Sequence, residues 1–375
     1  MPAEWAPHES TWLAWPHFRG DWPGKFDPIP WVYAEIIRTL TRHERVDLIV
    51  NNANAEKRAR KTLKLASALN KNIRFHRWPT NRVWTRDSGC TFVCDASLCS
   101  AGAPARESLG PTTAHVGTAA LGRPAERNSP EQLHAIKWRF NAWAKYANYR
   151  HDDKIGSLIA KAARVEEIRA HHNDTRVVLE GGSIDVNGAG TLLTTEECLL
   201  SRIQQRNPGF RREDYEQVFA SYLGIEKVIW LGQGIAGDDT HGHVDDITRF
   251  VAPRTILTMI EPNPKDKNHA SLQENLRRLK SATDQNGRPF DIVELPMPAP
   301  VTFEGRRLPA SYGNFYIANG AVLVPVFNDP NDRIALNILA DVFRDREVIP
   351  IYSGDLIWGF GALHCMTQQQ PRVGR

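Results

Sequence analysis

The chain has 375 residues, of which 41% are apolar and 24% are charged, values that are ordinary for a globular protein. Its 47 Lys and Arg residues and 43 Asp and Glu residues give a net charge of +4, without a dense basic block. This pattern argues against nucleic-acid binding and against an anionic membrane surface as a partner. The N-terminal residues lack the features of a secretion signal, and no apolar run approaches the roughly 18 residues of a membrane helix. We therefore expect a cytoplasmic protein.

Helical spacing of apolar residues predicts a helix over 31–41, after an irregular start that is rich in proline and tryptophan. The run VDLIV predicts a buried strand over 46–50. A second helix over 56–70 and a second strand over 72–78 continue the alternation. The order of elements therefore predicts an α/β protein.

From about residue 96 to 130 the composition changes to Ala, Gly, Pro, Ser and Thr, with few large apolar side chains. We expect a long mobile insertion here, either a solvated loop or a lid, within a single domain that spans 1–375. Beyond it, 131–149 and 153–172 both show helical spacing. The run VVLEGG at 177–182 predicts a strand that ends at two glycines.

A weak internal repeat is the most useful sign of organisation. Polar turns, each followed by a strand-like stretch, recur in RDSGCTFVCD, GGSIDVNGAGTLLTT, GHVDDITRFVAPRTILTMI and YGNFYIANGAVLVPVF, and GALHCMTQQQP closes the chain. Recurrence of a ββαβ-like unit predicts a propeller in which each unit contributes one inward turn to a common centre. The alternative is a doubly wound sheet, but neither GxGxxG nor GxxxxGK[ST] occurs in a setting that supports a nucleotide site.

The five cysteines are an odd number, so we expect free thiols rather than a disulfide framework. They are Cys90, Cys94, Cys99, Cys198 and Cys365. The first three are closely spaced but lack the paired spacing and the fourth ligand of a zinc site, so we expect no metal there. Cys365 differs, because it lies among small residues whose backbone N–H groups can approach a developing charge.

Carboxylates and a histidine accompany this thiol in three clusters. His243 and Asp245 would project to one face if GHVDD were a strand, although a loop histidine with solvated acids is the alternative. Asp87 in WTRD is either a ligand for a cation or a turn residue paired with an arginine such as Arg86. A thiolate, an imidazole and several carboxylates suit attack on the carbon of a guanidinium.

Two further residues belong to the same clusters. Glu180, at the end of VVLE, either orients a catalytic partner or caps the double-glycine turn. Trp84 is either a core residue or an indole face beside a guanidinium. We place both among the expected substrate-binding residues.

These blocks resemble the agmatine deiminase family, which is related to the Porphyromonas-type peptidylarginine deiminases within the guanidino-group-modifying superfamily. The resemblance covers nearly the whole chain, through MPAEWAPHESTWLAWP, WTRD, FNAW, LEGGSID, GTLLTTEECLL, GDDTHGHVDD, YGNFYIANGAVLVPVF and LHCMTQQQP. It implies the pentein fold, a five-bladed pseudo-symmetric α/β propeller. It also implies hydrolysis of agmatine to N-carbamoylputrescine and ammonia, in polyamine metabolism, without metal or organic cofactor.

The same resemblance assigns a role to each matching residue. Cys365 matches the family nucleophile and His243 the general acid and base. Asp87 and Asp245 match the carboxylates that grip the guanidinium, and Asp239 matches an acid associated with the far amine of agmatine. The expected intermediate is an S-alkylthiouronium on Cys365.

Three expectations concern features particular to this chain. We expect Asp238, Asp239 and Asp246 to form an acidic mouth that attracts the dicationic substrate. Phe360 stands where the resemblance leads us to expect glycine and could narrow the pocket. Cys90 lies close to Asp87 in sequence and is a rival thiol.

Four other functions are compatible with the sequence. A peptidylarginine deiminase or an amidinotransferase would use the same residues. The pair His241 and His243 resembles the HxH ligands of metal-dependent amidohydrolases. A guanidine-binding protein would bind the substrate without turnover. The sequence leaves the oligomeric state open, a homo-oligomer included.

Overall fold

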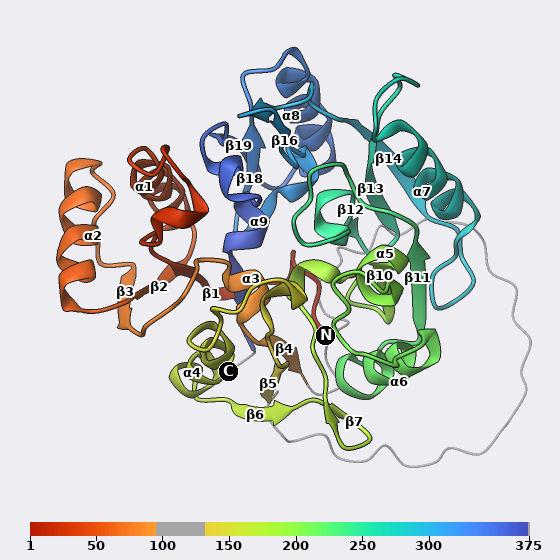
Figure 1. The fold of residues 1–375 in the computed structure, drawn as a ribbon, viewed down its shortest axis with the longest axis horizontal. Coiled ribbons are helices and arrows are strands. Elements are labelled where there is room, and N and C mark those ends of the chain that lie inside the picture. Colours follow the sequence, from red (N-terminus) through yellow and green to blue (C-terminus); the bar gives the residue numbers. More distant parts are fainter. Residues whose placement is uncertain (95–131, 374–375) are drawn as a thin grey trace, which may run out of the picture.

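The computed structural model describes residues 1–94 and 132–373 (Figure 1). The insertion predicted at about 96–130 lies outside the described residues, as does Cys99. Within the described ranges, no helix is long and apolar enough to cross a membrane.

Five sheets share one connectivity, in which an antiparallel pair of strands is followed by a helix and then by a strand parallel to the second. The first sheet contains β20 (Gln368–Pro371), β1 (His8–Ala14), β2 (Arg45–Val50) and β3 (Ile73–Arg77). The second contains β4 (Thr91–Cys94), β5 (Leu133–Lys137) and β6 (Glu166–Arg169). The third contains β9 (Asp185–Val186), β10 (Thr191–Thr195) and β11 (Lys227–Leu231). The fourth contains β12 (Thr248–Ala252), β13 (Thr255–Ile260) and β14 (Asp291–Pro296), and the fifth contains β17 (Tyr316–Ala318), β18 (Ala321–Val326) and β19 (Glu347–Tyr352).

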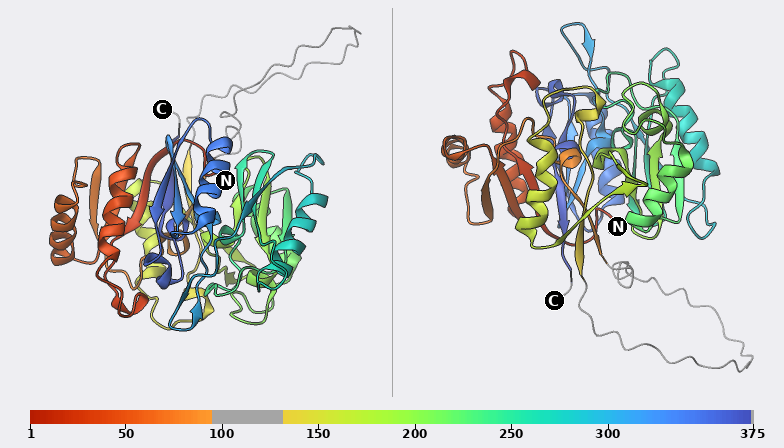
Figure 2. Two further views of the ribbon diagram at one scale, coloured as in Figure 1. Left: turned by 90° about the horizontal axis from the view of Figure 1, so that it is seen from above. Right: turned by 60° about the horizontal axis from the view of Figure 1, so that its bottom comes forward.

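The longer helices lie at the periphery and the sheets face the middle, as the views of Figures 1 and 2 agree. These helices are α1 (Ile29–Leu40), α2 (Ala53–Leu65), α4 (Ile155–Ala163), α6 (Arg212–Leu223), α7 (His269–Ser281) and α8 (Pro330–Val342). Local sequence explains their starts: the Asn52 side chain accepts a hydrogen bond from the backbone N–H of Ala55, and Asp329 and Asp332 form a capping box. The hairpins β7–β8 (His171–His172, Thr175–Arg176) and β15–β16 (Thr302–Phe303, Arg306–Arg307) extend from this frame.

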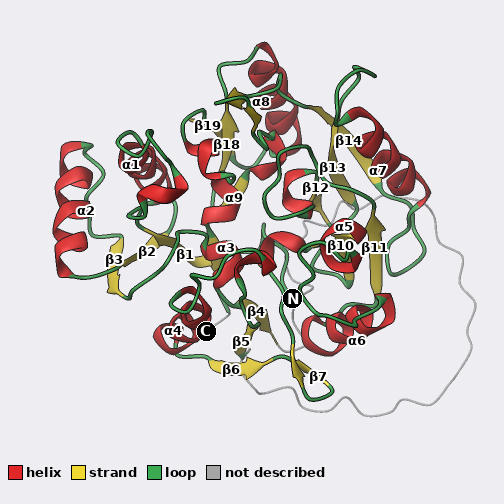
Figure 3. Cartoon of the chain, in the orientation of Figure 1, coloured by secondary structure: helices red, strands yellow, loops and turns green. Residues whose placement is uncertain are grey.

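Short helical turns connect the sheets to the centre of the molecule (Figure 3). They are α3 (Thr85–Ser88), η4 (Gly181–Ser183), η5 (Val244–Asp246), η6 (Tyr312–Asn314) and α9 (Leu363–Met366). Neighbouring turns contact one another, so residues from five distant parts of the chain meet there. The first sheet obtains its antiparallel partner from the C-terminal strand β20, which brings α9 to the same place. The predicted recurrence of inward turns is therefore confirmed.

Several local predictions are correct and others are wrong. The two helices predicted over 31–41 and 56–70 and the two strands predicted over 46–50 and 72–78 occur, with bounds a few residues away, as α1, α2, β2 and β3. The irregular start predicted before them is wrong in part, because it contains strand β1. The helix predicted over 131–149 is wrong: strand β5 is buried on both faces, and such a strand reads as a run of apolar residues. The helix predicted over 153–172 ends at Ala163, where Arg164 takes a left-handed conformation. The strand predicted over VVLEGG is wrong, because Val178 forms an isolated β-bridge with Arg139 and the segment is not part of a named strand.

Candidate active site

A pocket of about 330 Å³ opens above Cys365. Trp84, Asp87 and Trp143 line it together with Cys365. Its lining also contains Asp21, Arg82, Asp239, Arg306 and Phe360. The pocket is therefore both aromatic and charged, as a site for an organic cation requires.

Cys365 lies in α9, with its side chain almost fully buried. Its Sγ accepts a hydrogen bond from Asn314 Nδ2 at 3.1 Å and lies 3.7 Å from Asp245 Oδ2. Burial, together with the carboxylates of Asp245, Asp246 and Asp87, raises the pKa of this thiol well above its usual value. The sulfur is thus a neutral thiol until a positive charge enters the pocket.

His243 is fully buried, and neither ring nitrogen makes a hydrogen bond of ordinary length with a described residue. Nδ1 lies 4.0 Å from an oxygen of Asp87 and 4.0 Å from an oxygen of Asp245, while Nε2 lies 3.8 Å from Glu180 Oε2. Burial alone would lower the pKa of His243, but Asp87, Cys198 and Glu180 together raise it well above the usual value. The ring is an imidazolium with a proton to give.

Asp87 and Asp245 both lie close to the thiol, but their pKa values shift in opposite directions. Asp87 accepts hydrogen bonds from the backbone N–H of Gly182 at 3.0 Å and from Trp143 Nε1 at 2.9 Å. Burial and the charges of Asp245 and Glu180 raise the pKa of Asp87 to about 6, although His243 lowers it. Burial acts in the same direction on Asp245, but His364 and then His243 lower its pKa below the usual value.

Asp245 offers one oxygen to a ligand. Its Oδ2 faces His364 Nδ1 at 2.7 Å, whereas Oδ1 is buried without a hydrogen-bond partner in the described part of the chain. A buried acceptor left unpaired is costly unless a ligand satisfies it. Asp245, like His243, does not line the pocket itself, but it lies beside Cys365, and its Oδ1 is free to accept from an N–H group that reaches it.

Gly182 explains why the LEGGSID motif needs glycine beside the catalytic groups. A Cβ atom there would lie 2.5 Å from His243 Nδ1 and 3.0 Å from carboxylate oxygens of Asp245 and Asp87. Gly361 has a similar part, since a Cβ there would lie 2.7 Å from the Trp84 ring. Both glycines let the reacting side chains pack closely.

Known proteins are similar to this chain over its whole length. The family model for Porphyromonas-type peptidyl-arginine deiminase matches residues 1–371. The chain belongs to this family. An agmatine deiminase of Pseudomonas fluorescens is 33% identical, over 100% of this chain and 96% of that protein.

Solved structures give the same result. An agmatine deiminase of Enterococcus faecalis is 28% identical, with a TM-score of 0.83 over 99% of this chain and 95% of the other. A C. jejuni agmatine deiminase with substrate bound is 27% identical, with a TM-score of 0.79 over 100% and 96% of the two chains. The α/β pentein fold predicted from the sequence is confirmed; its division into five pseudo-symmetric blades stays a prediction.

The expected substrate-binding residues lie in two places. Trp84 and Asp239 line the pocket. The Asp239 carboxylate already accepts from Lys145 Nζ at 2.5 Å and from the Tyr146 hydroxyl at 2.6 Å. Glu180 is not part of the pocket lining: its carboxylate lies behind His243, where Arg206 Nε donates to it at 3.1 Å.

Sequence reasoning missed three residues of this family member's site. Asn314 donates to both Cys365 and Asp246 through Nδ2, and its Oδ1 accepts from the backbone N–H of His364 and Cys365. Cys198 lies beside His243 and Glu180, and Arg206 holds Glu180. Asn314 could have been found, because it occupies the inward turn of the fourth repeated stretch.

The predicted acidic mouth is wrong for two of its three residues. The Asp238 carboxylate accepts from Thr240 and from the backbone N–H groups of Gly242 and His243. Asp246 is buried against Asn314. Short loop sequences rich in acids often satisfy backbone donors in this way rather than facing solvent.

The strand predicted for GHVDD is also wrong, because the segment forms the turn η5. His243 and Asp245 nevertheless address the same site. His241, by contrast, faces Ser201 and Glu197, so the two histidines of the HxH pattern do not converge.

Two groups of possible metal ligands lie within the site, with ligand atoms within 4.8 Å of one another. They are Glu180, Cys198 and His243, and Asp245, Asp246 and Cys365. Arg206 already neutralises Glu180, and His364 already occupies one oxygen of Asp245. A metal cation beside these positive groups is unfavourable. Both sets therefore fit proton transfer and stabilisation of a cationic substrate better than metal binding.

The structure places Phe360 and Cys90, the two features particular to this chain, and also Asp185 of the LEGGSID motif. Phe360 lines the pocket in a left-handed conformation, with φ of 67°, and the guanidinium of Arg306 lies 4.7 Å from its ring centroid. The Asp185 carboxylate accepts hydrogen bonds from Arg249 Nε and from the backbone N–H of Phe250, so its role is structural. Burial raises the pKa of Cys90 to about 12, and this thiol does not line the pocket.

Proposed function

We propose that the chain is an agmatine deiminase, which hydrolyses the guanidinium of agmatine to N-carbamoylputrescine and ammonia. One observation carries the proposal: a buried thiol and the Asp87 carboxylate line an aromatic pocket, and His243 and an unpaired oxygen of Asp245 lie buried directly beside them. Relatives named agmatine deiminase over the full length of the chain support it.

The bound guanidinium donates N–H groups to Asp87 and to Oδ1 of Asp245. Its positive charge stabilises the thiolate, so Cys365 releases its proton to water when the substrate binds. The thiolate attacks the guanidinium carbon, and His243 gives its proton to the departing nitrogen as that C–N bond breaks. Ammonia leaves and a thiouronium remains on Cys365.

The second half uses the same groups in reverse. His243, now neutral, takes a proton from water, and the resulting hydroxide attacks the thiouronium carbon. The C–S bond breaks and the thiolate leaves with its electron pair. The proton of the added hydroxyl passes to this thiolate, which restores the neutral thiol and leaves a ureido group as the product. Residues of the chain, substrate and water supply every proton and electron pair, so we propose no metal or organic cofactor.

We propose that Glu180 orients His243 rather than binding substrate. Its carboxylate is 3.8 Å from His243 Nε2 and is held by Arg206, whose Nη2 also donates to the backbone carbonyl of Thr240. Cys198 packs against the same ring. The ring therefore presents Nδ1 toward the pocket carboxylates.

The direct test is release of ammonia and ureido product from agmatine, arginine and an arginine-containing peptide, on wild type and Cys365→Ser with EDTA present. We expect thiol-dependent turnover of agmatine that is indifferent to EDTA. Turnover of the peptide instead would identify a peptidylarginine deiminase, and transfer to a labelled amine would identify an amidinotransferase. Zinc-dependent turnover would identify a metal amidohydrolase, and binding without product would identify a binding protein.

The positive residues in and beside the pocket favour a second candidate substrate, a guanidino compound with a carboxylate at its far end. Lys145 already pairs with Asp239, and Arg82 pairs with Asp21. Arg306 lines the pocket, and the structure shows no carboxylate partner for it within the described residues. A linear guanidino acid belongs in the substrate panel, because turnover faster than that of agmatine would change the substrate class.

Lys145→Ala separates these two candidates. If the amine of agmatine binds Asp239, removal of the competing ammonium should lower KM for agmatine by about threefold, a modest effect because Lys145 is partly exposed. The same change should raise KM for a guanidino acid. Steady-state kinetics with both substrates measures the two effects, and an unchanged KM for agmatine would remove Asp239 as the amine ligand.

The pKa of Asp87 predicts the acid side of the pH profile. Burial, followed by the neighbouring carboxylates, raises this pKa to about 6, and only the ionised form holds the guanidinium. Activity is therefore present above about pH 6 and falls tenfold per pH unit below it. We expect kcat/KM for agmatine to follow this single ionisation, and a profile that stays flat down to pH 5 would contradict the role of Asp87.

A further inference from the structure

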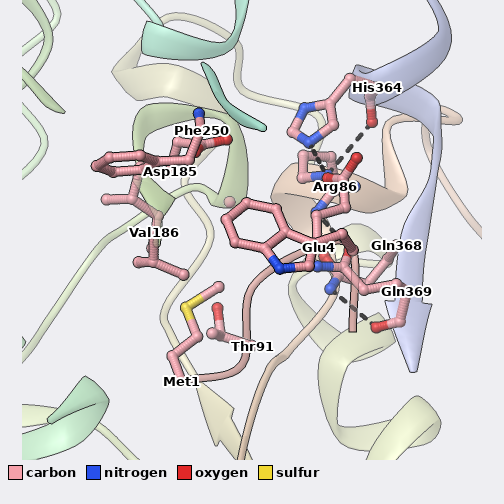
Figure 4. A pocket seen from close by; sticks show the side chains of 13 residues that line it. Met1, Glu4, Arg86, Thr91, Asp185, Val186, Phe250, His364, Gln368 and Gln369 are labelled. Carbon is pink, nitrogen blue, oxygen red and sulfur yellow. Dashed lines mark hydrogen bonds and ion pairs between the residues drawn. The ribbon is translucent and has the colours of Figure 1, made fainter. Parts of the chain in front are cut away.

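The residue before the nucleophile, His364, does not line the pocket of Cys365, and its ring lies between the carboxylates of Asp245 and Glu4. Figure 4 shows His364 in a second, small pocket that Glu4 and Arg86 also line. Its Nδ1 lies 2.7 Å from Asp245 Oδ2, and its Nε2 lies 2.7 Å from Glu4 Oε2. Ionised carboxylate oxygens only accept hydrogen bonds, so each ring nitrogen needs a proton to donate to its partner. His364 is thus a buried ring held between Asp245 and Glu4.

Glu4 reaches this position from the segment before the first strand. Its Oε1 accepts from the backbone N–H of Ile317 at 2.8 Å. Its Oε2 lies 3.0 Å from Arg249 Nη2 and 3.3 Å from Arg86 Nη2. Burial raises the pKa of Glu4, but Arg249, His364 and Arg86 lower it well below the usual value, so the carboxylate is ionised.

Charged groups face this chain of contacts from every neighbouring element. Arg86 comes from α3, Arg249 from β12 and Asp185 from β9, where Arg249 Nε donates to Asp185 at 2.6 Å. With Glu4, His364 and Asp245, they give three positive and three negative charges. Loss of either the glutamate or the histidine charge would unbalance the cluster.

On the pocket side, the charged and titratable neighbours of Asp245 are different. His243 lies 4.0 Å from its Oδ1, and Cys365 lies 3.7 Å from its Oδ2. Asp246 and Asp87 add negative charge close to it. These acids favour protonation of Asp245, and the imidazolium of His364 opposes them.

We propose that Glu4 and His364 are positioning residues that keep Asp245 ionised and hold its Oδ2, so that Oδ1 faces the substrate. The negative charge of Glu4 stabilises the positive charge of His364. This positive charge in turn stabilises the ionised carboxylate of Asp245. The inference rests on the role of Asp245 in the proposed function. Through Glu4, the N-terminal segment thus supports the active site on the side of Asp245 that faces away from the substrate.

The test is the pH dependence of kcat/KM for Glu4→Gln. An amide brings no negative charge to Nε2 of His364, so the histidine stabilises ionised Asp245 less and the pKa of Asp245 rises. We expect near-normal kcat/KM at pH 8 and a loss of about tenfold more than in wild type at pH 5.5. The acid limb should also become steeper, because a second carboxylate then titrates beside Asp87.

Glu44→Gln is the matched control, since Glu44 is another buried carboxylate that pairs with a histidine, His8, outside the pocket. It should lower the melting temperature without changing the pH profile. If Glu4→Gln lowers the melting temperature in the same way and its profile overlays that of wild type, the proposal is overturned. Unchanged stability and an unchanged profile would overturn it as well.

Nitrogen NMR of the wild-type protein tests the same claim without a folding risk, with His364→Gln used to assign the signal. We expect both ring nitrogens of His364 to be protonated at pH 7.5, and a neutral tautomer would overturn the proposal. This readout is independent of turnover. If wild type hydrolyses no guanidino substrate, the proposed function fails while the NMR result still decides whether His364 is charged.

Discussion

A Cys365→Ser variant should lose agmatine turnover by at least about 10⁴-fold. The hydroxyl of serine has a much higher pKa than a thiol, so a bound guanidinium cannot generate the alkoxide in this pocket of carboxylates. The side chain is nearly isosteric and keeps its contact with Asn314, so the fold should persist. Ammonia release under saturating agmatine measures the loss, and the melting temperature checks that the variant is folded.

Cys90→Ser is the matched control for this experiment. Cys90 is a buried thiol that does not line the pocket. We expect the variant to retain most of its activity. Loss of turnover in Cys90→Ser together with retention in Cys365→Ser would show that Cys365 is not the nucleophile.

Gly182→Ala should lower kcat/KM by about 100-fold, although residue 182 carries no reacting group. Its new Cβ would lie 2.5 Å from His243 Nδ1, so the imidazole must move. The carboxylates of Asp87 and Asp245 on either side would also shift, and displacements of about 1 Å are enough for a loss of this size. Steady-state kinetics measures the effect, which we expect mainly in kcat.

Gly320→Ala controls for the general cost of adding a methyl group to a strained glycine. Gly320 has a φ of 70° in the turn between β17 and β18, and its Cβ would lie 3.1 Å from His43. This variant should lose about 1 kcal/mol of stability and keep its activity. Equal losses of activity in both variants would show that Gly182 acts only through stability.

The recurrence of polar turns before strand-like stretches was enough to predict that distant residues meet at one centre. Each turn places a side chain there because the strand that follows fixes its direction. For this reason Cys365, His243, Asp87 and Asp245 come together as the sequence predicts. His243 and Asp245 come together through a short helical turn rather than a strand. Their proximity was therefore predicted correctly, although the strand from which it was predicted does not form.

Other features depend on contacts that no local pattern encodes. A strand buried on both faces, such as β5, has the composition of a helix face until its neighbours are known. The pairing of Glu4 with His364 joins residues 360 positions apart. Likewise, Asp238 reads as a solvent-facing acid until the loop that it caps is folded.

The most direct test of covalent catalysis at Cys365 is the intact mass of the protein, quenched in acid at intervals during agmatine turnover. We expect a species heavier than the free protein by the mass of agmatine less ammonia. Peptide mapping should place this adduct on Cys365, and the species should be absent from Cys365→Ser. An adduct on another residue, or complete turnover with no adduct at any time, would contradict the proposed mechanism.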